Sequence, residues 1–172
     1  MIILGIDQSY TKTGTAVLKD DELIKSKSWN FTKLKSKTEK RKEMKRITKG
    51  LINKYNCDMI IVERIRTFSR GQSGGSFFSM DYIKSTAALI ATIVDTAQLY
   101  GIPVYSVDTR SWKAQIVGKS THNKNESTKQ PTLDYVENTL EYTVVDDNEA
   151  DAICIAKYGF LPKTKQKLKK EQ

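Results

Sequence analysis

The chain has 172 residues, with 29 lysines and arginines against 20 acidic residues and a formal net charge of +9. That length suffices for one domain with a hydrophobic core and leaves no room for a second. The positive charge favours a polyanionic partner, most often nucleic acid, over a membrane surface. No apolar run approaches the roughly 18 residues of a membrane span, and the first residues lack the layout of a signal peptide. We therefore expect a cytoplasmic protein without membrane association.

The first third of the chain predicts three strands and a helix. Residues 2–7 and 14–18 are apolar runs joined by a polar turn, and residues 22–31 alternate like a third strand. Residues 38–55 carry apolar side chains at helical spacing and lysines and arginines elsewhere. This pattern predicts an antiparallel meander followed by an amphipathic helix with a basic outer face.

The middle of the chain predicts a buried strand, a loop and a long helix. Residues 57–64 form a continuous apolar run, typical of a strand covered on both faces. Residues 66–76 are rich in Gly and Ser, which predicts a mobile loop in which Arg66 and Arg70 are candidate DNA contacts. The helix predicted over 77–100 has an apolar stripe wide enough to pack on the sheet and against a second subunit.

The last third predicts a strand over 102–108, with Asp108 as the N-cap of a helix over 109–118. Residues 118–129 are polar and basic, and Lys124 is a candidate DNA contact there. Helices follow over 131–140 and 146–159, and residues 161–172 predict a basic, flexible tail. The order of elements predicts one α/β domain over residues 1–160 with a mixed five-stranded sheet.

Acidic residues mark the ends of the predicted buried strands. Asp7 and Glu63 each end such a strand, at the edge where sites form in α/β sheets. Asp147 and Asp151 lie one turn apart on the last predicted helix, and Asn148 is within reach of the same side. Two carboxylates about 4 Å apart repel by roughly 4 kcal/mol at an effective dielectric near 20. Because the chain has two isolated cysteines and one histidine, a balancing metal ion has to be one that binds carboxylate oxygens, as Mg²⁺ and Mn²⁺ do. Two such ions about 3.5–4 Å apart clamp the oxygens of a phosphodiester.

Each acid also has an ordinary alternative. Asp7 fits a strand-end turn, Glu63 fits an ion pair with a nearby arginine, and Asp147 fits a helix N-cap. Trp112 is expected in the core, with base stacking as its alternative. The combination of acids favours a metal site over these separate explanations.

Three stretches together resemble the RuvC-like Holliday junction resolvases. ILGIDQSYTKTG is similar to the opening of that family, IIVER to its second acidic strand and EADAICIA to its final helix, over roughly residues 1–158. The resemblance implies a ribonuclease H-like fold and a homodimer, with residues 77–100 as our candidate interface. It also implies a Mg²⁺-dependent endonuclease, with Mn²⁺ as substitute, in which metal-activated water attacks a phosphate and the 3′ oxygen leaves. Paired nicks across a four-way DNA junction would follow from dimer symmetry.

Carried over by position, the resemblance implies that Asp7, Glu63 and Asp151 are metal ligands. The family's fourth acid lies three residues before the last, where this chain has Asn148, so Asp147 or Asn148 takes that place, with Asp147 preferred for its charge. The family's phosphate-contacting region and its basic residue before the next helix match Lys113, Lys119 and Lys129. Phe68 is the nearest substitute for the wedge aromatic, whose position holds Arg66. A bacterium or a phage-infected host cell is the expected setting.

Three other functions remain open at this level. Asn148 is compatible with a junction-binding protein that has lost catalysis, and the altered wedge with a related nuclease for other branched DNA. DQSYTKTG also resembles the phosphate loop of actin-like ATPases, although those enzymes need two such domains.

Overall fold

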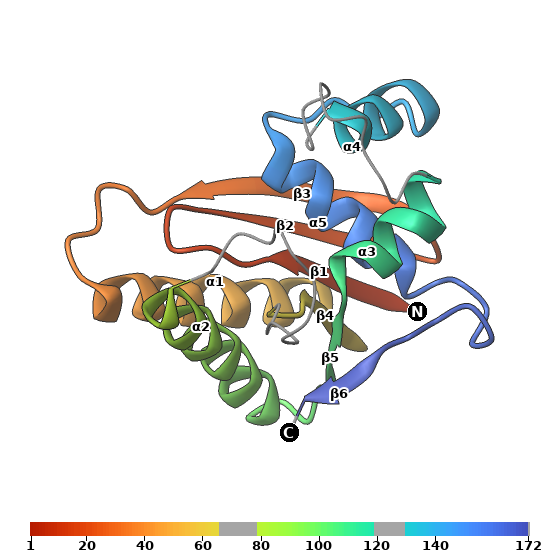
Figure 1. Ribbon diagram of the computed structural model, residues 1–172. Coiled ribbons are helices and arrows are strands. Elements are labelled where there is room, and N and C mark those ends of the chain that lie inside the picture. Colours follow the sequence, from red (N-terminus) through yellow and green to blue (C-terminus); the bar gives the residue numbers. More distant parts are fainter. Residues whose placement is uncertain (66–78, 119–129, 172) are drawn as a thin grey trace, which may run out of the picture.

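The computed structural model describes residues 1–65, 79–118 and 130–171, and within them a mixed sheet forms the centre of the molecule (Figure 1). Its strands lie in the order β3-β2-β1-β4-β5-β6. β1 is antiparallel to β2 and parallel to β4, which is parallel to β5. The strands are β1 (Ile2–Asp7), β2 (Lys12–Lys19), β3 (Glu22–Asn30), β4 (Met59–Glu63), β5 (Val104–Val107) and β6 (Lys169–Glu171). The predicted α/β class with a mixed sheet is confirmed.

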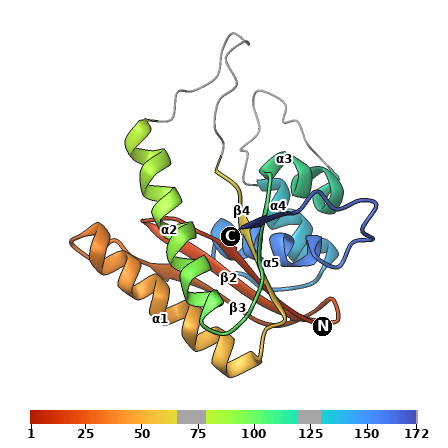
Figure 2. The ribbon, with the colours of Figure 1, turned by 90° about the horizontal axis from the view of Figure 1, so that it is seen from below.

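Helices cover both faces of the sheet (Figure 2). α1 (Lys37–Tyr55) and α2 (Met80–Gln98) pack together on one face, and α5 (Asp147–Tyr158) lies across β1 and β2 on the other. α3 (Thr109–Trp112) runs on into a π-helical segment, Lys113–Val117, and α4 (Gln130–Asp134) into a second, Tyr135–Thr139. Among the described residues, no helix is long and apolar enough to cross a membrane.

The apolar strands fill two cores because successive side chains point to opposite faces. Leu4 and Ile6 of β1 join the core under α1 and α2, whereas Ile3 joins the core under α5. Trp112 is fully buried in the second core, as expected. Burial of β1 and β4 on both faces makes them the rigid centre from which the site is built.

The sixth strand is the main difference from the prediction, which had five strands and a flexible tail over 161–172. β6 pairs antiparallel with β5, with Ser106 opposite Lys169. Lysine-rich composition predicted disorder, but strand pairing uses backbone groups, which composition does not report. The ordinary alternative for Asp147 is also wrong, because the N-cap of α5 is Asp146.

Candidate active site

Asp7 and Glu63 end neighbouring parallel strands, and a side-chain amide holds these ends together. The β1–β4 ladder runs as far as Ile6 and Val62. Beyond this last pair, the side-chain amide of Gln8 bonds to the backbone of Glu63. Gln8 Nε2 donates to the Glu63 carbonyl at 2.6 Å, and the Glu63 N–H donates to Gln8 Oε1 at 3.2 Å. The amide extends the ladder by one register and fixes the backbones that carry the two carboxylates.

Two glycines let α5 approach the sheet closely. A Cβ built on Gly14 would lie 1.7 Å from the carbonyl oxygen of Asn148, and one on Gly5 would lie 2.3 Å from that of Ala152. Gly14 is also the register partner of Asp7. Only glycine fits at these positions, and the first turn of α5 therefore passes directly over the end of β1.

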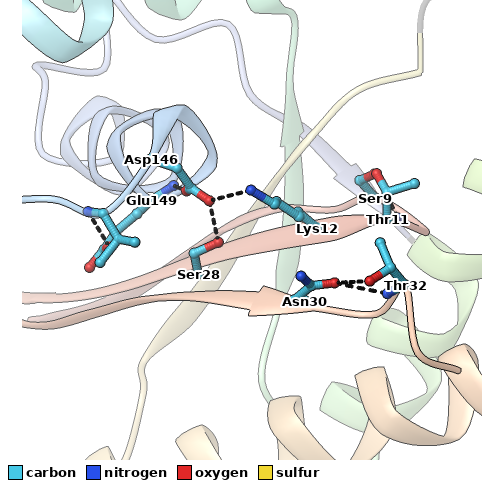
Figure 3. Close-up of polar contacts among 9 residues, drawn as sticks. Ser9, Thr11, Lys12, Ser28, Asn30, Thr32, Asp146 and Glu149 are labelled. Atoms are coloured by element: carbon cyan, nitrogen blue, oxygen red, sulfur yellow. Dashed lines mark hydrogen bonds and ion pairs between the residues drawn. The ribbon is translucent and has the colours of Figure 1, made fainter.

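A polar network fixes the start of α5 (Figure 3). Asp146 accepts a hydrogen bond from Ser28 Oγ at 2.7 Å and lies 3.5 Å from Lys12 Nζ. Its other oxygen accepts from the Glu149 N–H at 3.2 Å, which caps the helix. These contacts tie α5 to β2 and β3 at the residue that precedes Asp147.

The four predicted carboxylates act on one another electrostatically. Burial raises the pKa of Asp7 well above its ordinary value of 3.8. Negative charge on Glu63, and then on Asp151 and Asp147, raises that pKa further, while Lys113 opposes the shift. The structure thus brings together the acids of β1, β4 and α5 that the sequence singled out.

Asp151 is the most exceptional of these acids. Burial raises its pKa to about 7, an effect that Lys113 reduces and Glu63 increases. Its Oδ1 atom is buried and has no hydrogen-bond partner within the described part of the chain. The Thr132 hydroxyl is also buried without a partner and lies close enough to lower the pKa of Asp151. The Oδ1 atom can therefore be satisfied by this hydroxyl or by a bound cation.

Glu63 is held by hydrogen bonds from two side chains, and among the described residues no arginine forms the ion pair with it that was its alternative. Thr109 Oγ1 lies 2.6 Å from Glu63 Oε1, and Trp112 Nε1 donates to Oε2 at 3.2 Å. Both donors come from α3, which Asp108 caps through the Arg110 N–H, as predicted. The cap therefore sets the direction of a helix that orients a site carboxylate.

Lys113 supplies positive charge inside this acidic group. It follows Trp112, and its ammonium lies 5.1 Å from that residue's ring centroid. Its charge lowers the pKa of both Asp7 and Asp151. The predicted phosphate contact thus lies beside the carboxylates.

The donor set suits a hard divalent cation. Every candidate ligand offers oxygen, as Mg²⁺ and Mn²⁺ prefer, and the unsatisfied Asp151 Oδ1 fits a ligand role. Within residues 1–65, 79–118 and 130–171, no three acidic, histidine or cysteine side chains are yet grouped closely enough to hold an ion. Binding of an ion therefore requires the carboxylates to move closer together than they are in this structure.

The charge of Asp147 raises the pKa of both Asp7 and Asp151, which favours Asp147 over Asn148 as the fourth acidic position. The backbone of Asn148 lies against Gly14. The remaining predicted DNA contacts lie outside the described residues: Arg66, Phe68, Arg70, Lys119, Lys124 and Lys129.

Sequence reasoning missed the residues that support the carboxylates. Gln8, Thr109 and Asp146 each bond to an element distant in the sequence, which no local pattern reports. The only available signal was proximity, because Gln8 follows Asp7 and Asp146 precedes Asp147.

Solved structures share the fold of this chain at low sequence identity. No family model matches the sequence, and no curated protein matches it. Among solved structures, RuvC of Thermus thermophilus in complex with a Holliday junction substrate matches with a TM-score of 0.71 over 93% of each chain, at 17% identity. The chain has the RuvC fold. The yeast mitochondrial Holliday junction resolvase Ydc2 matches with a TM-score of 0.55 at 15% identity, over 90% of this chain and 75% of that one. Fowlpox virus resolvase, solved with Holliday junction DNA, also matches at 0.55 and 16% identity, over 94% and 100%. In this fold Asp7 and Glu63 thus lie at strand ends, and Asp147 and Asp151 lie on the last helix.

Proposed function

We propose that the protein is a metal-dependent endonuclease that resolves Holliday junctions. The observation that carries the proposal is the convergence of Asp7, Glu63 and Asp151, with raised pKa values for two of them, in a chain with the RuvC fold. The net charge of +9 also favours a polyanionic substrate such as DNA over an uncharged small molecule.

Asp7, Glu63, Asp147 and Asp151 would hold the divalent ions, two Mg²⁺ or Mn²⁺. A bound ion supplies a water of lowered pKa and balances charge on the phosphate. Thr109 and Trp112 orient the Glu63 carboxylate. Lys113 is near enough to Asp7 and Asp151 to shift their pKa values, and its positive charge would offset negative charge that develops on a phosphate.

Binding to branched DNA is supported by two observations. The chain carries nine more positive than negative charges, and two of the structures that share its fold contain Holliday junctions. With 6–10 phosphate contacts, affinity falls about 10³–10⁵-fold between 50 and 200 mM salt. We expect this activity in the cytoplasm of a bacterium or of a phage-infected cell.

We also propose a homodimer through α2. Leu89, Ile93 and Val94 of this helix pack into the core, while apolar side chains at its two ends remain exposed: Met80, Tyr82, Leu99 and Tyr100. A second copy covering them would make a two-fold interface, and two active sites related by that axis suit paired nicks. Sedimentation equilibrium should give twice the chain mass, and a monomer mass would contradict this arrangement.

A junction-binding protein without catalysis is the second candidate. It is favoured by Asn148 and by the absence of a grouped metal site among the described residues. Both candidates predict junction binding, so cutting separates them.

The test is to incubate the protein with a labelled four-way junction, a three-way junction and a linear duplex of the same sequences, in Mg²⁺, Mn²⁺ or EDTA. A resolvase nicks the four-way junction in opposing strands, leaves the duplex intact and is inactive in EDTA. Equal cutting of the three-way junction would broaden the substrate to branched DNA. Tight binding without cutting in either metal would favour the second candidate.

A further inference from the structure

The C-terminal segment is anchored to the sheet despite its charge. β6 extends the sheet beside β5 (Figure 1). Ser106 Oγ donates to Glu171 Oε1 at 2.6 Å and accepts from Arg64 Nε at 3.2 Å. Arg64 follows the site residue Glu63, and its N–H donates to the Val107 carbonyl at 2.8 Å. The last strand is therefore joined to the same ends of β4 and β5 that carry the site.

The residues before β6 are fixed as well. The buried Tyr158 hydroxyl accepts from the Lys167 N–H at 2.8 Å and lies 3.3 Å from the Lys165 carbonyl. Gln166 Nε2 donates to the carbonyls of Gly159 and Leu161 at 2.9 and 2.6 Å. Each of these contacts holds backbone or an uncharged side chain, and none uses a lysine ammonium.

The lysines of this segment point away from the protein. Gln166 and Leu168 turn inward, and Leu168 packs against the core under α5. The exposed residues that alternate with them or flank them are Lys163, Lys165, Lys167, Lys169 and Lys170. In the described part of the chain, no carboxylate pairs with any of these ammonium groups. We call them the C-terminal lysine row.

Protection of a sheet edge explains only part of this row. Lysines on an edge strand discourage pairing with another chain, which accounts for Lys169 and Lys170 on β6. It does not account for Lys163, Lys165 and Lys167, which precede the strand. Binding of an acidic protein would require apolar or shape-complementary contacts beside the lysines. A row of like charges along a fixed backbone instead matches the repeating phosphates of a nucleic acid.

We propose that the C-terminal lysine row binds the phosphate backbone of a DNA arm, as a second contact surface outside the carboxylate site. This inference rests on the proposed function for the identity of the nucleic acid. Because the backbone is already anchored, binding orders only the lysine side chains, which lowers its entropic cost. Lys169 lies opposite Ser106 near the carboxyl end of β5, so this lysine is the part of the row nearest the site edge, whereas Lys165 and Lys167 lie beside Tyr158 at the end of α5.

The test compares two variants with four fewer positive charges each. The first neutralises the row by Lys→Gln substitution at Lys163, Lys165, Lys167 and Lys169. The matched control has Lys→Gln at four exposed lysines of β2, β3 and α1, which are remote from β6 in the strand order: Lys19, Lys25, Lys45 and Lys49. Binding to a four-way junction and to a linear duplex is measured from 50 to 200 mM KCl, and thermal unfolding shows that both variants fold.

Because the row variant can no longer pair four lysines with phosphates, its slope of log K against log salt should fall by about 3–4. The control variant should keep the slope of the native protein to within about one phosphate pair, or roughly 0.9. A row variant with the same salt slope as the native protein would overturn the inference and would leave an acidic protein as the occupant of the row. Equal reductions of the slope in the row variant and the control variant would also overturn it. Native protein that binds the duplex as tightly as the junction and cuts neither would refute the proposed function. In that case the salt dependence of duplex binding by the row variant and the control variant would still show whether the row contacts DNA.

Discussion

Replacing Asp151 by Asn should make the metal-free protein more stable at high pH. In the folded protein, burial raises the pKa of Asp151 to about 7 from an ordinary value of 3.8. Between pH 4 and 7 the folded state therefore keeps a proton that the unfolded state releases, and stability falls as the pH rises through this window. The difference between a pKa of about 7 and one of 3.8 lowers the stability of the native protein by about 4 kcal/mol, reached in full above pH 7.

The assay is urea unfolding in EDTA at pH values from 4 to 8.5. The Asn variant should differ from the native protein by less than about 1 kcal/mol at pH 4, where the native carboxyl is protonated in the folded state and only about half ionised in the unfolded state. It should exceed the stability of the native protein by about 4 kcal/mol at pH 8.5. The exposed Asp95→Asn variant is the control and should show no such rise. A pH-independent difference for Asp151→Asn, or a variant less stable than the native protein at pH 8.5, would refute the electrostatic account of the site.

Two further predictions concern the supports of the site. Gly14→Ala should destabilise the protein by roughly 3 kcal/mol because the new Cβ collides with the Asn148 carbonyl. Gly50→Ala has open space around it in α1 and should stabilise the protein by about 0.5–1 kcal/mol. Thermal unfolding tests both variants, and a Gly14→Ala variant as stable as the native protein would contradict the close approach of α5. Thr109→Val removes the donor 2.6 Å from Glu63 Oε1 and should slow junction cutting about tenfold, equivalent to about 1.4 kcal/mol, with junction affinity unchanged. Thr109→Ser should restore the rate, and equal rates for Val and Ser would show that the hydroxyl does not position Glu63.

The sequence was sufficient to locate the carboxylates because their signal is local. A buried strand that ends in an acid is visible in IILGID and MIIVE, and the structure pairs these two strands in parallel, which brings their ends together. Helical spacing likewise placed Asp147 and Asp151 on one side of α5. These expectations use only the periodicity of single elements and the rule that parallel strands share an edge.

The remaining features depend on contacts between distant parts of the chain. β6 is held by Tyr158, Gln166 and Ser106, and none of these contacts has a pattern near the lysines whose composition indicated a flexible tail. The choice of Asp146 rather than Asp147 as N-cap depends on Ser28 and Lys12. In a run of two adjacent acids, local capping preference alone does not distinguish one from the other.

The central claim is that Asp7 belongs to a nuclease site. The most direct test measures the rate at which the native protein and the Asp7→Asn variant nick a four-way DNA junction in Mn²⁺. Asp20→Asn, in the turn between β2 and β3, is the matched control. We predict that Asp7→Asn binds the junction as tightly as the native protein and cuts it at least about a hundredfold more slowly, a loss of about 2.7 kcal/mol in transition-state stabilisation, while Asp20→Asn cuts at the native rate. Undiminished cutting by Asp7→Asn would contradict the assignment of the site.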